Sequence, residues 1–187
     1  MGRYSRILCE HEAAHAAVAS VLGLPVEEVR VDQPSDGEDG RCLFQAGEEQ
    51  HLEAAAVAAA PRVWIRGFRG TVFGRDANVG DGPDRMILTQ ELIKYTEALP
   101  VLERMRENQR LRYVIDTKVR DILCEYGDEV MRIADELQAS GRWTRGQGWA
   151  GGRRGGPTTW DDVAQQARRA REDRMARRER LARPRVA

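Results

Sequence analysis

The chain has 187 residues, enough to bury one hydrophobic core, so we expect one main domain and an appendage. Hydrophobic residues make up 41% of the sequence although its mean hydropathy is −0.60, so an apolar core must coexist with a very polar segment. No apolar run approaches the roughly 18 residues of a membrane helix, and the start lacks the apolar region of a secretion signal. The three cysteines show no CxxC spacing, which argues against a disulfide framework and favours a cytoplasmic protein.

Charge is distributed unevenly along the chain, although the formal net charge at pH 7 is +0. Residues 142–187 contain 13 arginines and five acidic residues, a net charge of +8, so residues 1–141 carry −8. This Arg-rich tail on an acidic body predicts an appendage that meets an acidic partner or nucleic acid.

Alanine-rich sequence with helically spaced apolar residues predicts a first helix over residues 4–22, ended by Gly23 and Pro25. Two stretches of strand-forming residues follow, at 26–31 and 41–44, on either side of a Pro-Ser-Asp-Gly segment. They predict a short β-hairpin.

A second helix is expected over residues 48–66, with a kink or break near Ala60 because Pro61 follows it. The glycine-containing segment 67–83 is predicted to be a loop. It leads into a third helix over residues 83–98, whose first turn suits a proline.

Further helical sequence covers residues 101–138, with a break expected near Gly127. We therefore expect a mostly α (α+β) fold in which a zincin-like helical domain with a small β-hairpin spans residues 1–140. A Gly/Arg-rich linker is predicted at 141–158 and an Arg-rich C-terminal helix and tail at 159–187.

Residues 11–15 read His-Glu-Ala-Ala-His, the HExxH pattern. On a helix His11 and His15 share one face, so both imidazoles can reach one metal ion. Glu12 projects beside the first ligand, where it can take a proton from a zinc-bound water whose pKa the metal lowers to about 7. The alternative is an ordinary helix with a polar face, but burying these groups among apolar neighbours without a partner would be costly. The pattern predicts a Zn²⁺ site with Glu12 as the catalytic base.

A catalytic zinc needs a third protein ligand. His51 is the only other histidine and is one candidate, although a histidine at a helix start is more typical of the surface. An aspartate or glutamate further along the chain is the other candidate, and spacing alone does not decide between them.

The first helix resembles the peptidase domain of the FtsH family of ATP-dependent zinc metalloproteases, and the likeness covers about residues 5–140. In that family a loop reads roughly T-G-A-x-N-D, then four residues and a threonine, and its aspartate is the third zinc ligand. Asp84 and Thr89 have the same interval, so the resemblance implies that Asp84 is the ligand. Asp81 and Asp76 remain alternatives.

This chain departs from the family pattern at several points. Ala14 replaces a glycine, and Asp81 and Pro83 replace small or polar residues. Neither lysine follows a glycine, so there is no Walker A loop, and the family's membrane helices are missing. The resemblance implies a stand-alone zinc metalloendopeptidase that acts on protein or peptide substrates without its own ATPase.

Two other functions are consistent with the sequence. One is a peptidase of the ImmA type, which also carries HExxH and cleaves a specific regulator. The other is a non-catalytic scaffold or nucleic-acid-binding protein that acts through the Arg-rich tail. Trp143, Trp149 and Trp160 alternate with Arg and Gly as in segments that bind single-stranded nucleic acid, although we favour a linker whose aromatic side chains dock on the body.

Overall fold

The computed structural model describes residues 4–32, 39–69, 81–144 and 160, and at Asp81 the backbone alone. Contacts divide the chain into two units, Met1–Arg154 and Gly155–Ala187. The account that follows concerns the first unit. The Arg-rich helix predicted at 159–187 lies, apart from Trp160, outside the described residues.

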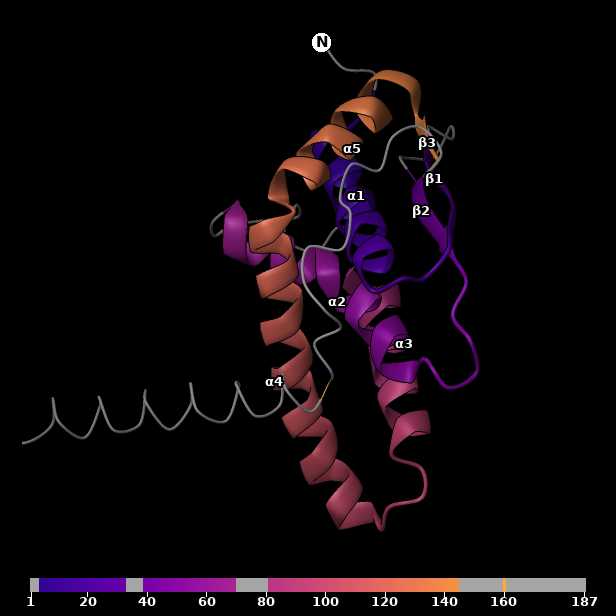
Figure 1. Cartoon of the computed structure of the whole chain (residues 1–187), viewed down its shortest axis with the longest axis vertical. Helices are drawn as coiled ribbons and strands as arrows, with labels where there is room; N and C mark the ends of the chain where they lie inside the picture. Colours follow the sequence, from indigo (N-terminus) through magenta and orange to yellow (C-terminus); the bar gives the residue numbers. More distant parts are fainter. Residues whose placement is uncertain (1–3, 33–38, 70–80, 145–159, 161–187) are drawn as a thin grey trace, which may run out of the picture. The chain divides into compact units, whose positions relative to one another are not determined.

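The described part of the first unit is a mostly helical α+β fold with five helices and one three-stranded antiparallel sheet (Figure 1). Its elements are α1 (Arg6–Val21), β1 (Val26–Asp32), β2 (Asp39–Phe44), α2 (His51–Phe68), α3 (Asp81–Tyr95), α4 (Val101–Glu125), α5 (Gly127–Ser140) and β3 (Arg142–Trp143). The predicted fold class and hairpin are confirmed. None of these helices is long and apolar enough to cross a membrane, as far as the described residues go.

Helix α1 lies at the centre of the unit, and every residue from Leu8 to Ser20 is buried. Its many alanines let neighbouring elements approach it from several sides. The helix ends as the sequence predicts, because Gly23 has a φ of 81° that a residue with a side chain rarely adopts. The Leu24 N–H donates to the Ala19 carbonyl at 2.9 Å and the Gly23 N–H to Ser20 at 3.3 Å, which together close the last turn.

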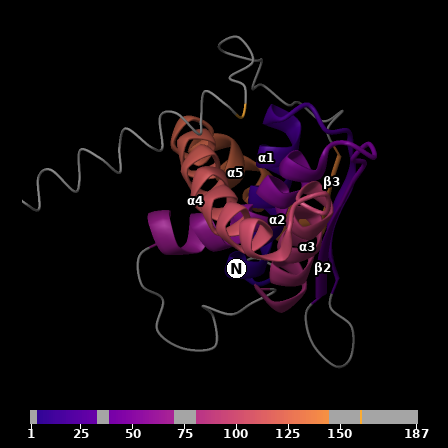
Figure 2. The same cartoon turned by 90° about the horizontal axis from the view of Figure 1, so that it is seen from below.

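The sheet forms one side of the unit, with the helices on its inner face (Figure 2). Its strand order is β2-β1-β3, so β1 is central and β2 is an edge strand in the described sheet. Strands β1 and β2 pair from Val26–Phe44 to Asp32–Asp39. The three valines of β1, Val26, Val29 and Val31, are buried, and the strand packs against α1, as expected for a strand with one covered face.

Strand β3 was not expected from the sequence. Val29 of β1 pairs with Trp143, whose side chain is 0% exposed. Gly141 ends α5 with a φ of 76° and turns the chain back along β1. The folded body therefore extends at least to Trp143, past the boundary expected after residue 140, and the first residues assigned to the linker belong to the core.

A kink or a break was expected near Ala60, and there is no break, because α2 continues without interruption through Pro61. A proline inside a helix removes one hydrogen bond and strains the preceding turn. Here residues 54–61 are all buried, and Val63, Trp64 and Ile65 are buried beyond them. Packing on both sides of the proline thus keeps the helix together.

The bounds of the remaining helices lie close to those predicted from the sequence. Helix α3 begins at Asp81, two residues before the predicted start, and packs against α2 through Leu88 and Leu92. Helices α4 and α5 are separated at Tyr126, where a break was expected. This arrangement places the first turn of α3 opposite the middle of α1.

Candidate metal centre

The HExxH residues lie in the buried middle of α1. His11 and His15 are 3% and 7% exposed, and their ring centroids are 5.0 Å apart. Glu12 beside them is 4% exposed. Burial of three polar side chains in an alanine-rich helix is costly unless they have partners.

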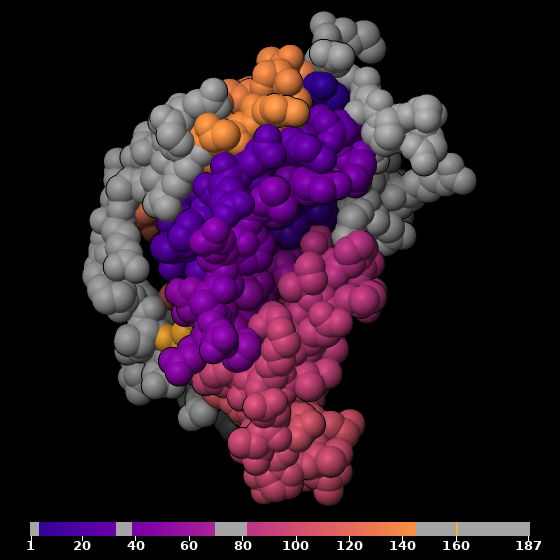
Figure 3. Space-filling view, turned by 90° about the vertical axis from the view of Figure 1, so that its right-hand side faces the viewer, coloured from indigo at the N-terminus to yellow at the C-terminus, as the bar shows by residue number. Residues whose placement is uncertain are grey.

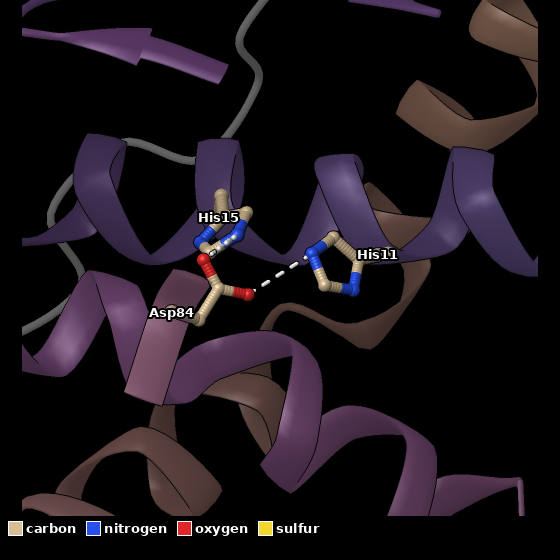
Figure 4. Close-up of side chains that lie close together, drawn as sticks. All are labelled: His11, His15 and Asp84. Carbon is tan, nitrogen blue, oxygen red and sulfur yellow. Dashed lines mark ion pairs between the residues drawn. The ribbon is translucent and has the colours of Figure 1, made fainter. Parts of the chain in front are cut away.

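The partner is Asp84 in the first turn of α3, which points between the two imidazoles (Figure 4). One carboxylate oxygen lies 3.1 Å from His11 Nε2 and the other lies 3.3 Å from His15 Nε2. One ligand atom from each of the three residues lies within 4.8 Å of the other two. The structure thus brings together, from two helices, the three residues expected as ligands, and the group could hold a metal ion.

The second ring nitrogen of His15 faces helix α2. His15 Nδ1 lies 2.8 Å from the backbone carbonyl of Val57, which is also buried. Because a carbonyl can only accept, Nδ1 carries the proton of this hydrogen bond. Nε2 is therefore the nitrogen that faces Asp84, and once it gives up its proton its lone pair is available to a metal ion, in the tautomer that a ligand needs.

The electrostatics keep Asp84 negative. Burial alone would raise the pKa of its carboxyl, but the hydrogen bonds with His11 and His15 outweigh burial and hold that pKa well below its usual range. For His15, burial lowers the pKa of the ring, whereas Asp84, Glu12 and the Val57 carbonyl together raise it more. The group consequently favours a positive species, a proton or a cation, between its members.

The pKa of Glu12 is shifted in the opposite direction from that of Asp84. Burial raises the pKa of its carboxyl, and the nearby histidines offset only part of that effect. Glu12 Oε1 lies 3.9 Å from His11 Nε2. Its side chain runs along Gly40 of β2, where an added Cβ would stand 2.7 Å from Oε1. No local sequence pattern points to Gly40, because its contact with Glu12 joins two elements that are separate along the chain.

A cleft of about 370 Å³ opens over these residues. Its lining includes the three candidate ligands and Glu12, residues of β2, and the apolar side chains of Leu8, Phe44, Ala58, Pro83 and Ile87. Figure 3 shows this side of the molecule, where the hairpin (purple) and α3 (pink) meet. An extended chain segment could therefore reach the group from outside.

Of the other candidate ligands, the structure describes the side chain of His51, which lies elsewhere. His51 Nδ1 lies 2.7 Å from Glu91 Oε2, and His51 does not belong to the group around Asp84. The side chain of Asp81 and the whole of Asp76 lie outside the described residues. Among the described residues, Asp84 is the carboxylate that meets both histidines.

None of the three cysteines forms a disulfide. Cys9 is fully buried in α1. Cys42 lines the cleft, and burial, reinforced by the carboxylates of Glu12 and Asp84, raises the pKa of its thiol. Cys42 is therefore a neutral thiol at neutral pH rather than an anionic neighbour of the site.

A buried ion-pair cluster, which the sequence analysis did not identify, lies one residue before the motif. Glu10 is fully buried and accepts hydrogen bonds from Trp64 Nε1 at 3.0 Å, from Arg6 at 2.8 Å and from Arg69. Burial alone would raise the pKa of Glu10, but Arg69, Trp64 and Arg6 together lower it. The cluster ties α1 to the end of α2, and its only trace in the sequence is a glutamate inside an apolar helix.

No protein-family model matches the chain, and no curated protein matches it. The site must therefore be interpreted from its own residues and geometry.

Proposed function

We propose that this chain is a zinc-dependent peptidase that hydrolyses peptide bonds of protein or peptide substrates. The observation that carries the proposal is the convergence of His11, His15 and Asp84 next to the buried Glu12, at the floor of an accessible cleft.

The donor set fits zinc. Two imidazole nitrogens and one carboxylate oxygen make a three-ligand set that leaves the fourth position for water or substrate. With metal–ligand bonds of about 2.0–2.2 Å, two ligand atoms of a tetrahedral site are about 3.3 Å apart. The two Asp84 oxygens lie 3.1 Å from His11 Nε2 and 3.3 Å from His15 Nε2, close to that spacing, and one ligand atom of each residue lies within 4.8 Å of the other two.

Bound zinc would acidify a water molecule and polarise the carbonyl of the scissile peptide. Glu12 projects beside the ligands, where its carboxylate can accept the proton of the attacking water and then deliver it to the leaving amine. Burial moves the pKa of Glu12 towards neutral pH, which suits a group that must both take and return a proton.

The position of strand β2 beside the cleft favours a peptide as the substrate. Five residues of this strand, Asp39, Gly40, Arg41, Cys42 and Phe44, line the cleft, and β2 is an edge strand of the described sheet. An extended peptide can add to such an edge through main-chain hydrogen bonds, which recognise backbone rather than a particular side chain. We therefore expect unfolded or flexible segments to be the substrates.

The relationship to the FtsH peptidase domain is part of this proposal and rests on the motif and on the Asp84–Thr89 interval. Thr89 Oγ1 donates to the Arg85 carbonyl at 2.7 Å and accepts from Arg112 Nη2 at 2.8 Å. Thr89 thus ties the helix that carries Asp84 to α4, which gives the matched threonine a structural role.

The test is hydrolysis of an unfolded, fluorescently labelled protein by the zinc-loaded chain. Glu12→Gln should keep the metal and lose at least about 100-fold in rate, because an amide cannot accept the proton. Glu49→Gln, on an exposed glutamate before α2, is the matched control and should retain the full rate. A zinc-loaded Glu12→Gln protein that cleaves at the wild-type rate would show that Glu12 is not the base.

A further inference from the structure

We infer that Pro61 of α2 is a positioning residue for His15, because it leaves the Val57 carbonyl open to the imidazole. The inference rests on the proposed metal site, and it assigns a role to a residue that contacts neither the ion nor the substrate.

Helix α2 lacks one of its regular backbone hydrogen bonds. In an α-helix each N–H donates to the carbonyl four residues earlier. The donor for the Val57 carbonyl would be the N–H of residue 61, which is a proline and has none. Since α2 continues through Pro61, Val57 presents a carbonyl without its helical partner in the interior of a continuous helix.

His15 supplies the hydrogen bond that the Val57 carbonyl lacks within α2. Val57 is fully buried, so a carbonyl left unpaired there would lower the stability of the fold. His15 Nδ1 lies 2.8 Å from that carbonyl and donates to it. The missing helical hydrogen bond is thus replaced by one that crosses from α1 to α2.

This hydrogen bond sets the tautomer of His15 in the proposed metal site. Holding the proton on Nδ1 leaves the lone pair on Nε2, and Nε2 lies 3.3 Å from Asp84. Outer hydrogen bonds of this kind fix the tautomer and ring orientation of metal-ligating histidines. His11 has no comparable support, since its buried Nδ1 finds no hydrogen-bond partner among the described residues. The orientation of His15 therefore depends on the Val57 carbonyl.

Pro61→Ala separates this role from a structural one. Alanine restores the N–H, which competes with His15 for the Val57 carbonyl, and it is also the better helix former. We expect thermal stability to stay level or rise while zinc affinity, measured by competition with a chromophoric chelator, falls about tenfold. Pro61→Ser restores the same N–H and should behave alike. Pro100→Ala, at the residue that precedes α4, is the control and should leave zinc affinity unchanged.

A second readout needs no metal. In the metal-free protein the Nδ1 proton of His15 should give a slowly exchanging imidazole resonance by NMR, and this signal should be lost or shifted in Pro61→Ala. An unchanged resonance together with unchanged zinc affinity would overturn the inference. If the wild-type chain binds no zinc, the proposed function fails, and the imidazole resonance still decides whether Pro61 orients His15.

Discussion

Glu91 Oε2 on α3 lies 2.7 Å from His51 Nδ1 at the first residue of α2. Glu91 follows Asp84 by seven residues, two turns of helix, so the two carboxylates lie on the same side of α3. Asp84 contacts the histidines of α1, and Glu91 contacts His51 at the start of α2. The His51–Glu91 contact consequently helps to set the rotation of the helix that carries the proposed third ligand.

Glu91→Gln should therefore destabilise the protein in a pH-dependent way. Burial alone would raise the pKa of Glu91, but Lys94 and His51 outweigh it and leave the pKa lowered. A carboxyl with a lowered folded pKa stabilises the fold above its unfolded pKa of about 4.3, and this contribution is lost as the pH falls through the folded value. We expect a loss of about 1 kcal/mol at pH 7, because the group is partly exposed.

Urea unfolding at pH 7 and pH 3 measures this difference. The gap between wild type and Glu91→Gln should shrink at the lower pH, whereas Glu125→Gln, on an exposed glutamate of α4, should differ little from wild type at either pH. A gap of equal size at both pH values would mean that the charge of Glu91 does not contribute.

Gly40→Ala should impair hydrolysis without removing the metal. The added Cβ would stand 2.7 Å from Glu12 Oε1 and 2.8 Å from its Cγ, closer than real contacts, so the Glu12 side chain must move. The ligand nitrogens and Asp84 need not move with it. We expect a fall in kcat of about tenfold or more with zinc content unchanged.

Gly67→Ala is the matched control, since its added Cβ would meet nothing within 4 Å. Hydrolysis rates and zinc content of the two variants, measured side by side, distinguish the outcomes. Full activity in Gly40→Ala would contradict the position assigned to Glu12.

Truncation should locate the end of the folded body. A chain of residues 1–146 keeps β3 and should remain folded, whereas residues 1–140 lose Trp143, which is fully buried and paired with β1. Removal of this side chain should cost about 3 kcal/mol. Thermal unfolding of the two fragments checks this, and equal melting temperatures would mean that β3 contributes nothing.

The sequence was sufficient where the signal is local. The HExxH spacing places two histidines on one helical face, the order of apolar residues predicts the helices and hairpin, and Gly23 ends α1 as expected. Asp84 was different, because only its interval to Thr89, through the family resemblance, singled it out.

Contacts between segments that are distant in the sequence could not be predicted from local patterns. Trp143 pairs with a strand more than 100 residues earlier, and the composition around it is that of a linker. Pro61 predicts a kink or a break, but the buried residues on both sides of it keep α2 continuous. The link from Val57 to His15 depends on two helices meeting in one register, which no pattern along the chain encodes.

The central claim is that His11, His15 and Asp84 hold one zinc ion, and the metal content of the purified chain tests it most directly. Elemental analysis after gentle purification should find about one zinc per wild-type chain. His15→Ala and Asp84→Ala should each remove most of it, while Glu12→Gln should keep it. A wild-type chain that carries no zinc, and whose melting temperature does not rise when zinc is added, would contradict the account.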